Sequence, residues 1–417
     1  MKDNRCYMQE VRNRIMKDLE FGEELSDGQM KDLISRHLME YQSIGHLSLR
    51  DRTRMGKEIF YSLRKLDVLQ ELMEDDSVTE IMVNGKDHVF VEREGRISRT
   101  PLSFESEEKL LQVIQQIVSG CNRAVNEASP IVDARLPGGA RVNVVLSPIA
   151  LNGPILTIRR FSDQPMTMER LQEAGALNQE AAEFLEKAVR AKYNILVSGG
   201  TGSGKTTFLN ALSQFIPPDE RVITIEDSAE LQLWGVENLI RMETRNANIE
   251  GGRQITIRDL IRTSLRMRPD RIIVGEVRGP EALDMVGSAM NCGHDGSMST
   301  AHANSAADML VRLETMILMG VELPVSAIRR QIASGVDLIV HLARLRDKSR
   351  KVVNISEVTG MEKEAIMLNP LFEFRETRET RETRETGEKC GDQVKGELYR
   401  IGELKFTFKL ENAGLIS

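Results

Sequence analysis

The chain has 417 residues and a formal net charge of −7, which allows two or three domains and gives no basic surplus of the kind that a general nucleic-acid binder carries. No apolar run approaches the roughly 20 residues of a membrane span and no signal-peptide core opens the chain, so a soluble, cytoplasmic protein is expected. The four cysteines form no C-x-x-C pair, which argues against a zinc ribbon and a disulfide framework.

Residues 1–70 predict a helical extension. Ser26 followed by Gln29 matches a capping box, and apolar residues recur behind it at helical spacing. His37 lies on that apolar stripe without a partner at metal-ligand spacing, so we interpret it as a packed histidine. Docking of these helices on the rest of the chain is favoured over docking on a partner.

Residues 71–160 change to a strand pattern and predict a small α/β domain. Short apolar runs flank the turn pair Asn84-Gly85, and two further strands flank Asn152-Gly153-Pro154. An amphipathic helix is expected over 105–118.

Arginines stand out in this second segment. Arg135 and Arg141 flank a glycine-rich loop, and Arg159 and Arg160 end a strand. Because adjacent strand residues point to opposite faces, at most one of the last pair can face a given site. Such side chains can reach a triphosphate, but composition alone favours solvated or locally paired arginines.

Residues 161–177 contain proline and glycine and are interpreted as a linker. From there the alternation of strands and helices predicts a mostly parallel sheet with helices on both faces. Ligands of such sheets lie at the carboxyl ends of the strands, and this rule ranks the residues that follow.

The segment from Gly199 to Thr206 fits the phosphate-loop pattern G-x-x-x-x-G-K-[ST], after an apolar run and before a helix-compatible stretch. Its backbone N–H groups and the helix N-terminus suit phosphate oxygens. Lys205 is expected to contact the β- and γ-phosphates and Thr206 to hold Mg²⁺. The expected nucleotide-binding residues are Gly200, Thr201, Gly202, Ser203, Gly204, Lys205, Thr206 and Thr207.

Two carboxylates end predicted strands. Glu226 follows the strand 221–225 and Glu276 follows the strand 271–275, so both lie beside the phosphate loop if their strands neighbour its own. Glu276 is the preferred residue to polarise the attacking water, and Glu226 is the second choice. Asp270 opens the later strand, about 16 Å from the active edge, and is excluded as a metal ligand.

Between these strands, an i, i+4, i+8 row of Arg258, Arg262 and Arg266 lies next to an apolar row. The row suits a subunit interface or a solvated flank, and the interface is slightly favoured.

His294 and His302 lie eight residues apart among Gly, Ser and Thr, which does not match a zinc spacing. A loop of this kind can sense a γ-phosphate through a neutral imidazole. From the residues alone, a packed or surface role is equally compatible.

The C-terminal part begins with two apolar runs, 336–342 and 352–355, that predict a hairpin. Residues 375–390 contain four consecutive Arg-Glu-Thr units and bury nothing apolar, so an exposed low-complexity insertion is expected. Residues 391–417 are interpreted as a terminal hairpin or tail.

Four motifs occur in a fixed order: 199–207, 223–227, 265–278 and 293–303. Together they resemble the Walker A motif, Asp box, atypical Walker B motif and His box of the secretion-ATPase superfamily behind type II secretion, type IV pili and type IV secretion. The segments 78–85 and 133–138 are most similar to the CpaF branch, the motors of tight-adherence (Flp) pili. The four-cysteine zinc module of many type II secretion and pilus extension motors is absent, which argues against those branches.

The resemblance implies a RecA-like P-loop ATPase domain over 178–374, a smaller α/β N-terminal domain and an N-terminal helical extension. It implies a homo-hexamer that uses ATP and Mg²⁺ and docks on an inner-membrane platform protein, peripheral to the inner face of the cell membrane. It also implies that Arg135, Arg141 and Arg159 act as arginine fingers, and it favours His294 and His302 as sensors.

The expected function is therefore ATP-driven pilus assembly of the Flp/Tad type or type II-like protein secretion. A type IV secretion motor for conjugation or effectors is the nearest alternative. A nucleic-acid translocase is disfavoured by the acidic balance, and no direct nucleic-acid partner is expected. A nucleotide-binding scaffold without turnover is disfavoured by Glu226, Glu276, Lys205 and Thr206.

Overall fold

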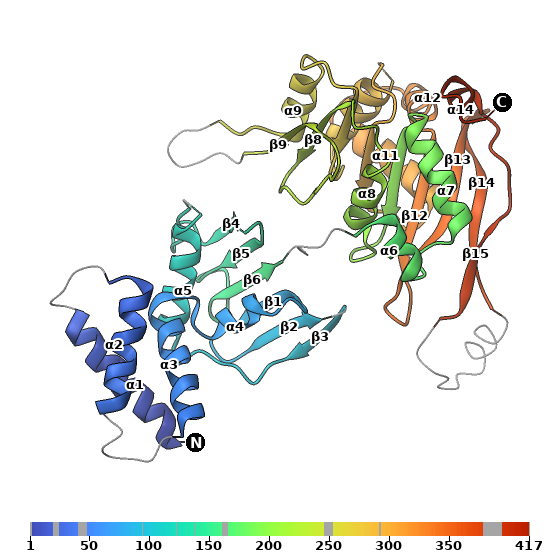
Figure 1. Ribbon diagram of the computed structural model, residues 1–417. Helices are drawn as coiled ribbons and strands as arrows, with labels where there is room; N and C mark the ends of the chain where they lie inside the picture. The colour runs from blue at the N-terminus through green and yellow to red at the C-terminus, as the bar shows by residue number, and fades with distance from the viewer. Residues whose placement is uncertain are drawn as a thin grey trace. The chain divides into compact units, whose positions relative to one another are not determined.

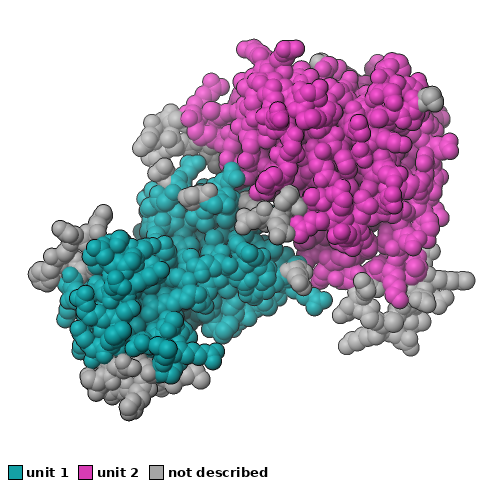
Figure 2. Space-filling view, viewed as in Figure 1, with its two compact units in different colours: residues 1–162 teal, residues 163–417 magenta. Residues whose placement is uncertain are grey.

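The computed structural model describes residues 2–416 except 20–24, 41–47, 94, 122, 137, 161–165, 246–252, 292 and 378–393. Most of the Arg-Glu-Thr insertion expected over 375–390 lies outside the described residues. The chain divides into two compact units, residues 1–162 and 163–417, coloured separately in Figure 2. Each unit is described by itself below.

The first unit begins with three helices that share a core of their own. They are α1 (Lys2–Leu19), α2 (Asp27–Glu40) and α3 (Leu49–Arg64). The capping box that opens α2 is confirmed, because the Gln29 N–H donates to Ser26 Oγ at 3.3 Å and the Ser26 N–H donates to Gln29 Oε1 at 2.8 Å. His37 packs as predicted, with Nε2 2.8 Å from the Asp18 carboxylate.

The rest of the first unit is a six-stranded antiparallel sheet in the order β3-β2-β1-β6-β5-β4 (Figure 1). Its strands are β1 (Val78–Asn84), β2 (Val89–Arg93), β3 (Arg96–Arg99), β4 (Ile131–Arg135), β5 (Arg141–Val145) and β6 (Ile155–Arg159). Helix α5 (Glu107–Ser119) buries one apolar face against this sheet, and the short helices η2 (Asp67–Leu69) and α4 (Gln70–Glu74) precede it. The expected strand pairs and helix are confirmed.

The second unit is built on a nine-stranded sheet in the order β15-β14-β13-β12-β7-β11-β10-β8-β9. The six strands from β12 to β9 in that order run parallel, and β13, β14 and β15 add an antiparallel edge. Their bounds are β7 (Ile195–Gly199), β8 (Arg221–Glu226), β9 (Asn238–Glu243), β10 (Arg271–Val274), β11 (Met298–Ala301), β12 (Leu338–Arg344), β13 (Arg350–Glu362), β14 (Ala365–Glu376) and β15 (Gly396–Arg400).

Helices cover both faces of this sheet, each over its own apolar cluster (Figure 1). One face carries α6 (Met168–Glu173), α7 (Gln179–Arg190), α8 (Lys205–Ser213) and α14 (Phe408–Asn412). The other carries α9 (Ile257–Ser264), α10 (Glu281–Asp284), the π-helix η3 (Met285–Met290), α11 (Ala306–Leu318) and α12 (Val325–Gly335). This is the doubly covered α/β sheet that the alternation predicts.

Two segments differ from their expected roles. Residues 168–173, expected within the linker 161–177, form α6, which Thr167 caps by accepting the Arg170 N–H. Met168 of this helix and Leu177 beyond it are buried in the core of the second unit. The C-terminal segment is not a separate hairpin: β15 pairs with β14, and Leu410 of α14 packs into the same core.

Candidate nucleotide site

The phosphate loop connects β7 to α8 at the carboxyl edge of the parallel strands. All five residues of β7 are buried between β12 and β11. A Cβ built on Gly199 would lie 2.4 Å from the Leu342 carbonyl oxygen, so only glycine fits where the loop leaves the strand. Gly204 has φ +92° and caps α8 without a side-chain hydrogen bond, so the first N–H groups of this helix face the loop uncapped.

Lys205 is largely buried, and its ammonium group lies between the phosphate loop and His302. Nζ donates to the Gly200 carbonyl oxygen at 3.1 Å and lies 3.2 Å from His302 Nδ1. A bound polyphosphate requires such a cation together with the main-chain N–H groups of the loop.

The strand order shows that neither carboxylate strand neighbours β7, so the condition stated from the sequence is not met. The neighbours of β7 are β12 and β11, while β10 and β8 follow further along the sheet. The sequence gives little sign of β11, since it has only four residues and two of them are Ser299 and Thr300. This missed strand carries His302 directly beyond its end.

β11 separates the phosphate loop from Glu276, and His302 contacts residues on both sides of this strand. Its Nε2 lies 2.9 Å from Glu276 Oε1 while its Nδ1 faces the Lys205 ammonium. Burial and the Lys205 charge lower the pKa of the imidazole, so it is neutral at pH 7. Nδ1 then accepts from Lys205, and the Nε2–H is turned toward the carboxylate.

Glu276 is therefore positioned beside the loop through β11 and His302. Its Oε2 accepts from an Arg278 guanidinium N–H at 2.6 Å. Its Oε1 is buried and lacks a hydrogen bond of suitable angle among the residues that the structure describes. A buried carboxylate oxygen with spare capacity is a suitable acceptor for a water molecule.

Glu226 lies on the adjacent strand, 3% exposed. Its Oε1 accepts the N–H groups of Glu230 and Leu231, each at 2.8 Å, and so holds the turn after β8. Burial raises the pKa of this carboxyl to about 7. The side chain also packs on Gly275, where a Cβ would come within 2.9 Å of Glu226 Cγ.

His294 does not lie beside His302 at the phosphate loop of the same unit, and its expected role as a sensor stays a prediction. Its Nδ1 lies 3.0 Å from the Pro269 carbonyl oxygen, before β10. The two histidines flank opposite ends of β11, and a four-residue strand spans about 13 Å. Asp270 lies at the same amino end as His294, where its carboxylate accepts the Arg221 N–H at 2.8 Å.

The sequence did not single out contacts that β12 and β13 make with the loop. The buried Ser198 Oγ lies 2.8 Å from His341 Nδ1, directly across the β7–β12 register. Arg350 Nε donates to the Gly202 carbonyl oxygen at 2.9 Å. A histidine inside the apolar run 336–342 is the signal that this strand contacts a polar neighbour.

The residues at the loop fit a nucleotide with Mg²⁺. Thr206 is the second residue of α8 and partly exposed. Within the described ranges, no group of three or more His, Cys, Asp or Glu side chains could hold a metal ion on its own. The Thr206 hydroxyl would serve as a ligand to Mg²⁺ beside the phosphate oxygens of a bound nucleotide.

The expected arginines of the first unit lie in one row. Arg135 is opposite Arg141 in the β4–β5 register, and Arg141 is opposite Arg159 in the β5–β6 register. The three side chains therefore share one face and one end of the sheet. Arg160 does not join this row. Its guanidinium donates to the carbonyl oxygens of Asp75 and Val78.

The arginines of α9 have an intramolecular role that neither expected alternative covered. Arg258 Nε donates to one Asp284 oxygen at 2.5 Å, and Arg262 Nε donates to the other at 3.0 Å. The Asp284 side chain is 8% exposed, so the pair neutralises a buried carboxylate of α10.

The chain is similar to known proteins over most of its length. The family described as "Type II/IV secretion system protein" matches residues 63–405. A Mycobacterium tuberculosis protein whose name assigns it provisionally to conjugal transfer is 36% identical over 301 residues, covering 71% of this chain and 85% of its own. Conjugal transfer protein TrbB of Rhizobium radiobacter is 33% identical, with 75% and 93% covered. Type IV secretion system protein VirB11 of Brucella suis is 33% identical, with 66% and 84% covered.

Solved structures share the fold. The pilus retraction motor PilT with bound ADP matches with a TM-score of 0.51 at 19% identity, over 84% of this chain and 87% of that one. The Yersinia pseudotuberculosis ATPase DotB matches with a TM-score of 0.54 at 16% identity, over 70% and 78%. The fold class, a RecA-like motor domain with a smaller α/β domain and N-terminal helices, is thereby confirmed.

Proposed function

The chain belongs to the type II/IV secretion system protein family, and from that premise we propose that it is an ATP hydrolase that powers a secretion or pilus machine. The observation that carries the proposal is the contact chain from Lys205 through His302 to Glu276 at the carboxyl edge of the parallel sheet. It joins a phosphate-binding cation to an acceptor for water through one neutral imidazole.

Each residue of this chain has a separate task. Lys205 and the N–H groups of the loop bind the β- and γ-phosphates. Glu276 Oε1 orients the attacking water and accepts its proton as the water oxygen bonds to the γ-phosphorus, while the bond from that phosphorus to the β–γ bridging oxygen breaks and ADP leaves. His302 holds the Glu276 carboxylate toward the loop. Mg²⁺, which Thr206 and phosphate oxygens would hold, supplies charge neutralisation at the leaving group.

We assign the second carboxylate a supporting role. Both N–H bonds to Glu226 Oε1 come from the turn after β8, and its Cγ packs on Gly275, immediately before Glu276. Glu226 thus fixes the backbone that presents Glu276.

Arg135, Arg141 and Arg159 supply the arginine fingers in this proposal. Their shared row gives one end of the N-terminal sheet a concentrated positive charge, with Glu80 opposite Arg159 as the next residue of the row. Guanidinium groups of this kind stabilise the charge that develops on a transferring phosphoryl group.

For the machine itself, we propose a hexameric motor of the CpaF type that drives Flp/Tad pilus assembly or type II-like secretion through an inner-membrane platform protein. The N-terminal segments 78–85 and 133–138 support this branch. None of the helices in the described part of the chain is long and apolar enough to cross a bilayer. Membrane association would accordingly depend on the platform partner.

A conjugation or effector-secretion motor is the second candidate. The names of the relatives TrbB and VirB11, which refer to conjugal transfer and type IV secretion, favour it. Affinity purification of the full chain from its own cells separates the two candidates. A pilus-type platform protein supports the first, and a DNA-coupling protein supports the second.

Substitution of the two central residues tests the hydrolase proposal. We expect Glu276→Gln to lower steady-state ATP turnover at least 100-fold while a fluorescent nucleotide still binds, because only the water acceptor is removed. Lys205→Ala should lose both turnover and nucleotide affinity. Asp270→Asn, at the opposite end of β10, is the matched control and should turn over ATP within twofold of the wild type. Wild-type turnover in Glu276→Gln contradicts the assignment.

A further inference from the structure

The three N-terminal helices lie almost entirely outside the family match. The family match begins at residue 63, and α3 ends at Arg64, so α1, α2 and nearly all of α3 precede the match. They enclose a separate apolar core that includes Val11, Ile34 and Phe60. A module outside the shared ATPase that has its own core suits a task specific to this protein.

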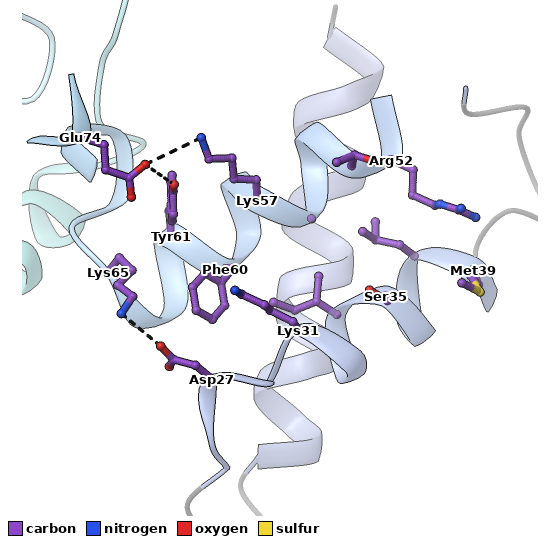
Figure 3. Close-up of a pocket in the computed structure, with 14 residues that line it drawn as sticks. Asp27, Lys31, Ser35, Met39, Arg52, Lys57, Phe60, Tyr61, Lys65 and Glu74 are labelled. Carbon is purple, nitrogen blue, oxygen red and sulfur yellow. Dashed lines mark hydrogen bonds and ion pairs between the residues drawn. The ribbon is translucent and has the colours of Figure 1, made fainter. Parts of the chain in front are cut away.

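We propose that the groove between α2 and α3 binds an acidic, amphipathic helix of a partner protein. The groove has a volume of about 620 Å³ and is lined along one side of each helix (Figure 3). Its α2 residues include Asp27, Lys31, Ile34 and Leu38, at the i, i+4, i+7, i+11 spacing of a single helical face. The site is remote in sequence from the phosphate loop and does not depend on ATP turnover.

The floor of the groove is apolar and tightly built. Ile34 and Leu38 are each 1% exposed, and Phe60 is 5% exposed. Gly56 lies between them on α3, where a Cβ would be 3.5 Å from Leu38 Cδ1. Position 56 carries no side chain, so α3 adds no Cβ to the groove at this point. A larger residue at 56 would occupy the space that a guest side chain needs.

The rim is positively charged, in contrast to the acidic chain as a whole. Its charged residues are the cations Lys31, Arg52, Lys57 and Lys65 and the carboxylates Asp27 and Glu74. Asp27 pairs with Lys65 at 3.1 Å, and Lys57 pairs with Glu71 at 3.2 Å and lies 3.9 Å from Glu74. Lys31 Nζ lies 5.0 Å from the Phe60 ring centre, directly over the floor, and the structure shows no carboxylate within salt-bridge distance of it among the residues described.

This combination fits a helix better than a lipid surface. Helix α2 has 14 residues and is about 21 Å long, which suits a guest helix with three or four apolar anchors on one face. The guest's acidic residues would flank that face and meet Lys31 and the other rim cations. A bilayer needs apolar side chains that project outward, whereas Ile34, Leu38 and Phe60 lie at the bottom of a groove.

The test uses the full chain and a fluorescent 18-residue helical peptide. The peptide carries Leu at positions i, i+4, i+7 and i+11 with Glu on both flanks, and a second peptide has Lys at every Glu position. We expect the acidic peptide to bind and the basic one not to bind. Gly56→Leu and Lys31→Glu should each weaken binding at least tenfold, while ATP turnover stays unchanged. Lys17→Glu, an exposed charge reversal on α1, is the matched control and should bind as the wild type.

Four binding results and one change of oligomeric state overturn the proposal. The binding results are equal binding of the two peptides, no binding of the acidic peptide, unchanged affinity in both groove variants, and binding of anionic phosphatidylglycerol vesicles without any binding of peptide. The change of oligomeric state is dissociation of an oligomer of the full chain in the Gly56→Leu variant while neither peptide binds. That result would mean that a second copy of the chain occupies the groove, and it would overturn the proposal. Lys31→Glu changes an exposed side chain, so it keeps the test decisive if Gly56→Leu fails to fold.

Discussion

Glu226 shows how burial sets the chemistry of one residue. Its carboxyl has a pKa of about 7 in the folded protein, above the ordinary value of 4.5. The protonated form is thus favoured by folding, so this group's contribution to stability is complete below pH 4.5 and is lost as the pH rises through 7. At neutral pH, Glu226 is a cost to stability that the two N–H bonds to Oε1 only partly offset.

We predict that Glu226→Gln removes this pH dependence. The amide keeps an oxygen for the Glu230 and Leu231 N–H groups but cannot ionise. Between pH 5 and pH 8 the free energy of unfolding should shift by about 2 to 3 kcal/mol in the variant's favour relative to the wild type. Urea unfolding at both pH values, followed by the fluorescence of Trp234, the single tryptophan, measures the shift. A constant difference between the two proteins contradicts the assigned pKa.

At the scale of elements, the contact between β7 and β12 shapes the start of the phosphate loop. A Cβ at Gly199, the last residue of β7, would lie 2.4 Å from the Leu342 main-chain oxygen of β12. The same Cβ would lie 2.6 Å from Ser203 Oγ. The main-chain oxygen belongs to a paired strand and cannot retreat without breaking the register. Gly200, the next residue, has nothing within 4 Å of the same position.

This asymmetry predicts opposite outcomes for neighbouring alanine substitutions. Gly199→Ala should displace the loop from β12, lower nucleotide affinity at least tenfold and destabilise the second unit by about 1 to 3 kcal/mol. Gly200→Ala keeps its N–H and meets no atom, so affinity should stay within twofold of the wild type. Titration with a fluorescent nucleotide compares the two variants. Similar losses in both would show that the loop tolerates no side chain at all, independent of β12.

Element types were more predictable from the sequence than their order in space. The apolar runs of β7, β8 and β10 are long enough to identify buried strands, and each ends at the expected phosphate-loop or carboxylate residue. Nothing in local sequence states which parallel strands become neighbours, because register depends on crossovers through distant helices. The four-residue β11 was missed for the same reason, since its burial comes from both flanking strands and not from its own composition.

The site was predictable in its parts and not in its connections. Lys205 and Glu276 follow from motif and strand-end position, whereas the bridge through His302 depends on β11 lying between β7 and β10. Ser198 and His341 illustrate the same limit, since 143 residues separate them and only the sheet register places them 2.8 Å apart. Tertiary pairing supplies this information.

Each of the two units carries charged residues to which the proposal assigns a part in the reaction. The second unit carries the phosphate loop and Glu276, and the first carries a row of three arginines that strand register places on one face. Arg160 follows Arg159 directly but is tied to main-chain oxygens of Asp75 and Val78 within the first unit. The two adjacent arginines therefore provide an internal comparison between catalysis and structure.

We predict that Arg141→Ala and Arg159→Ala each lower kcat at least tenfold and leave nucleotide affinity within about threefold. A group that acts on the charge developing in the transition state affects turnover more than ground-state binding. Arg160→Ala should instead keep kcat and lower the stability of the first unit by about 1 to 3 kcal/mol, because the carbonyl oxygens of Asp75 and Val78 lose their donor. Steady-state ATPase assays, nucleotide titration and thermal melting separate the effects. Wild-type turnover in both Arg141→Ala and Arg159→Ala would confine the row to a structural role and leave the second unit to complete its own site.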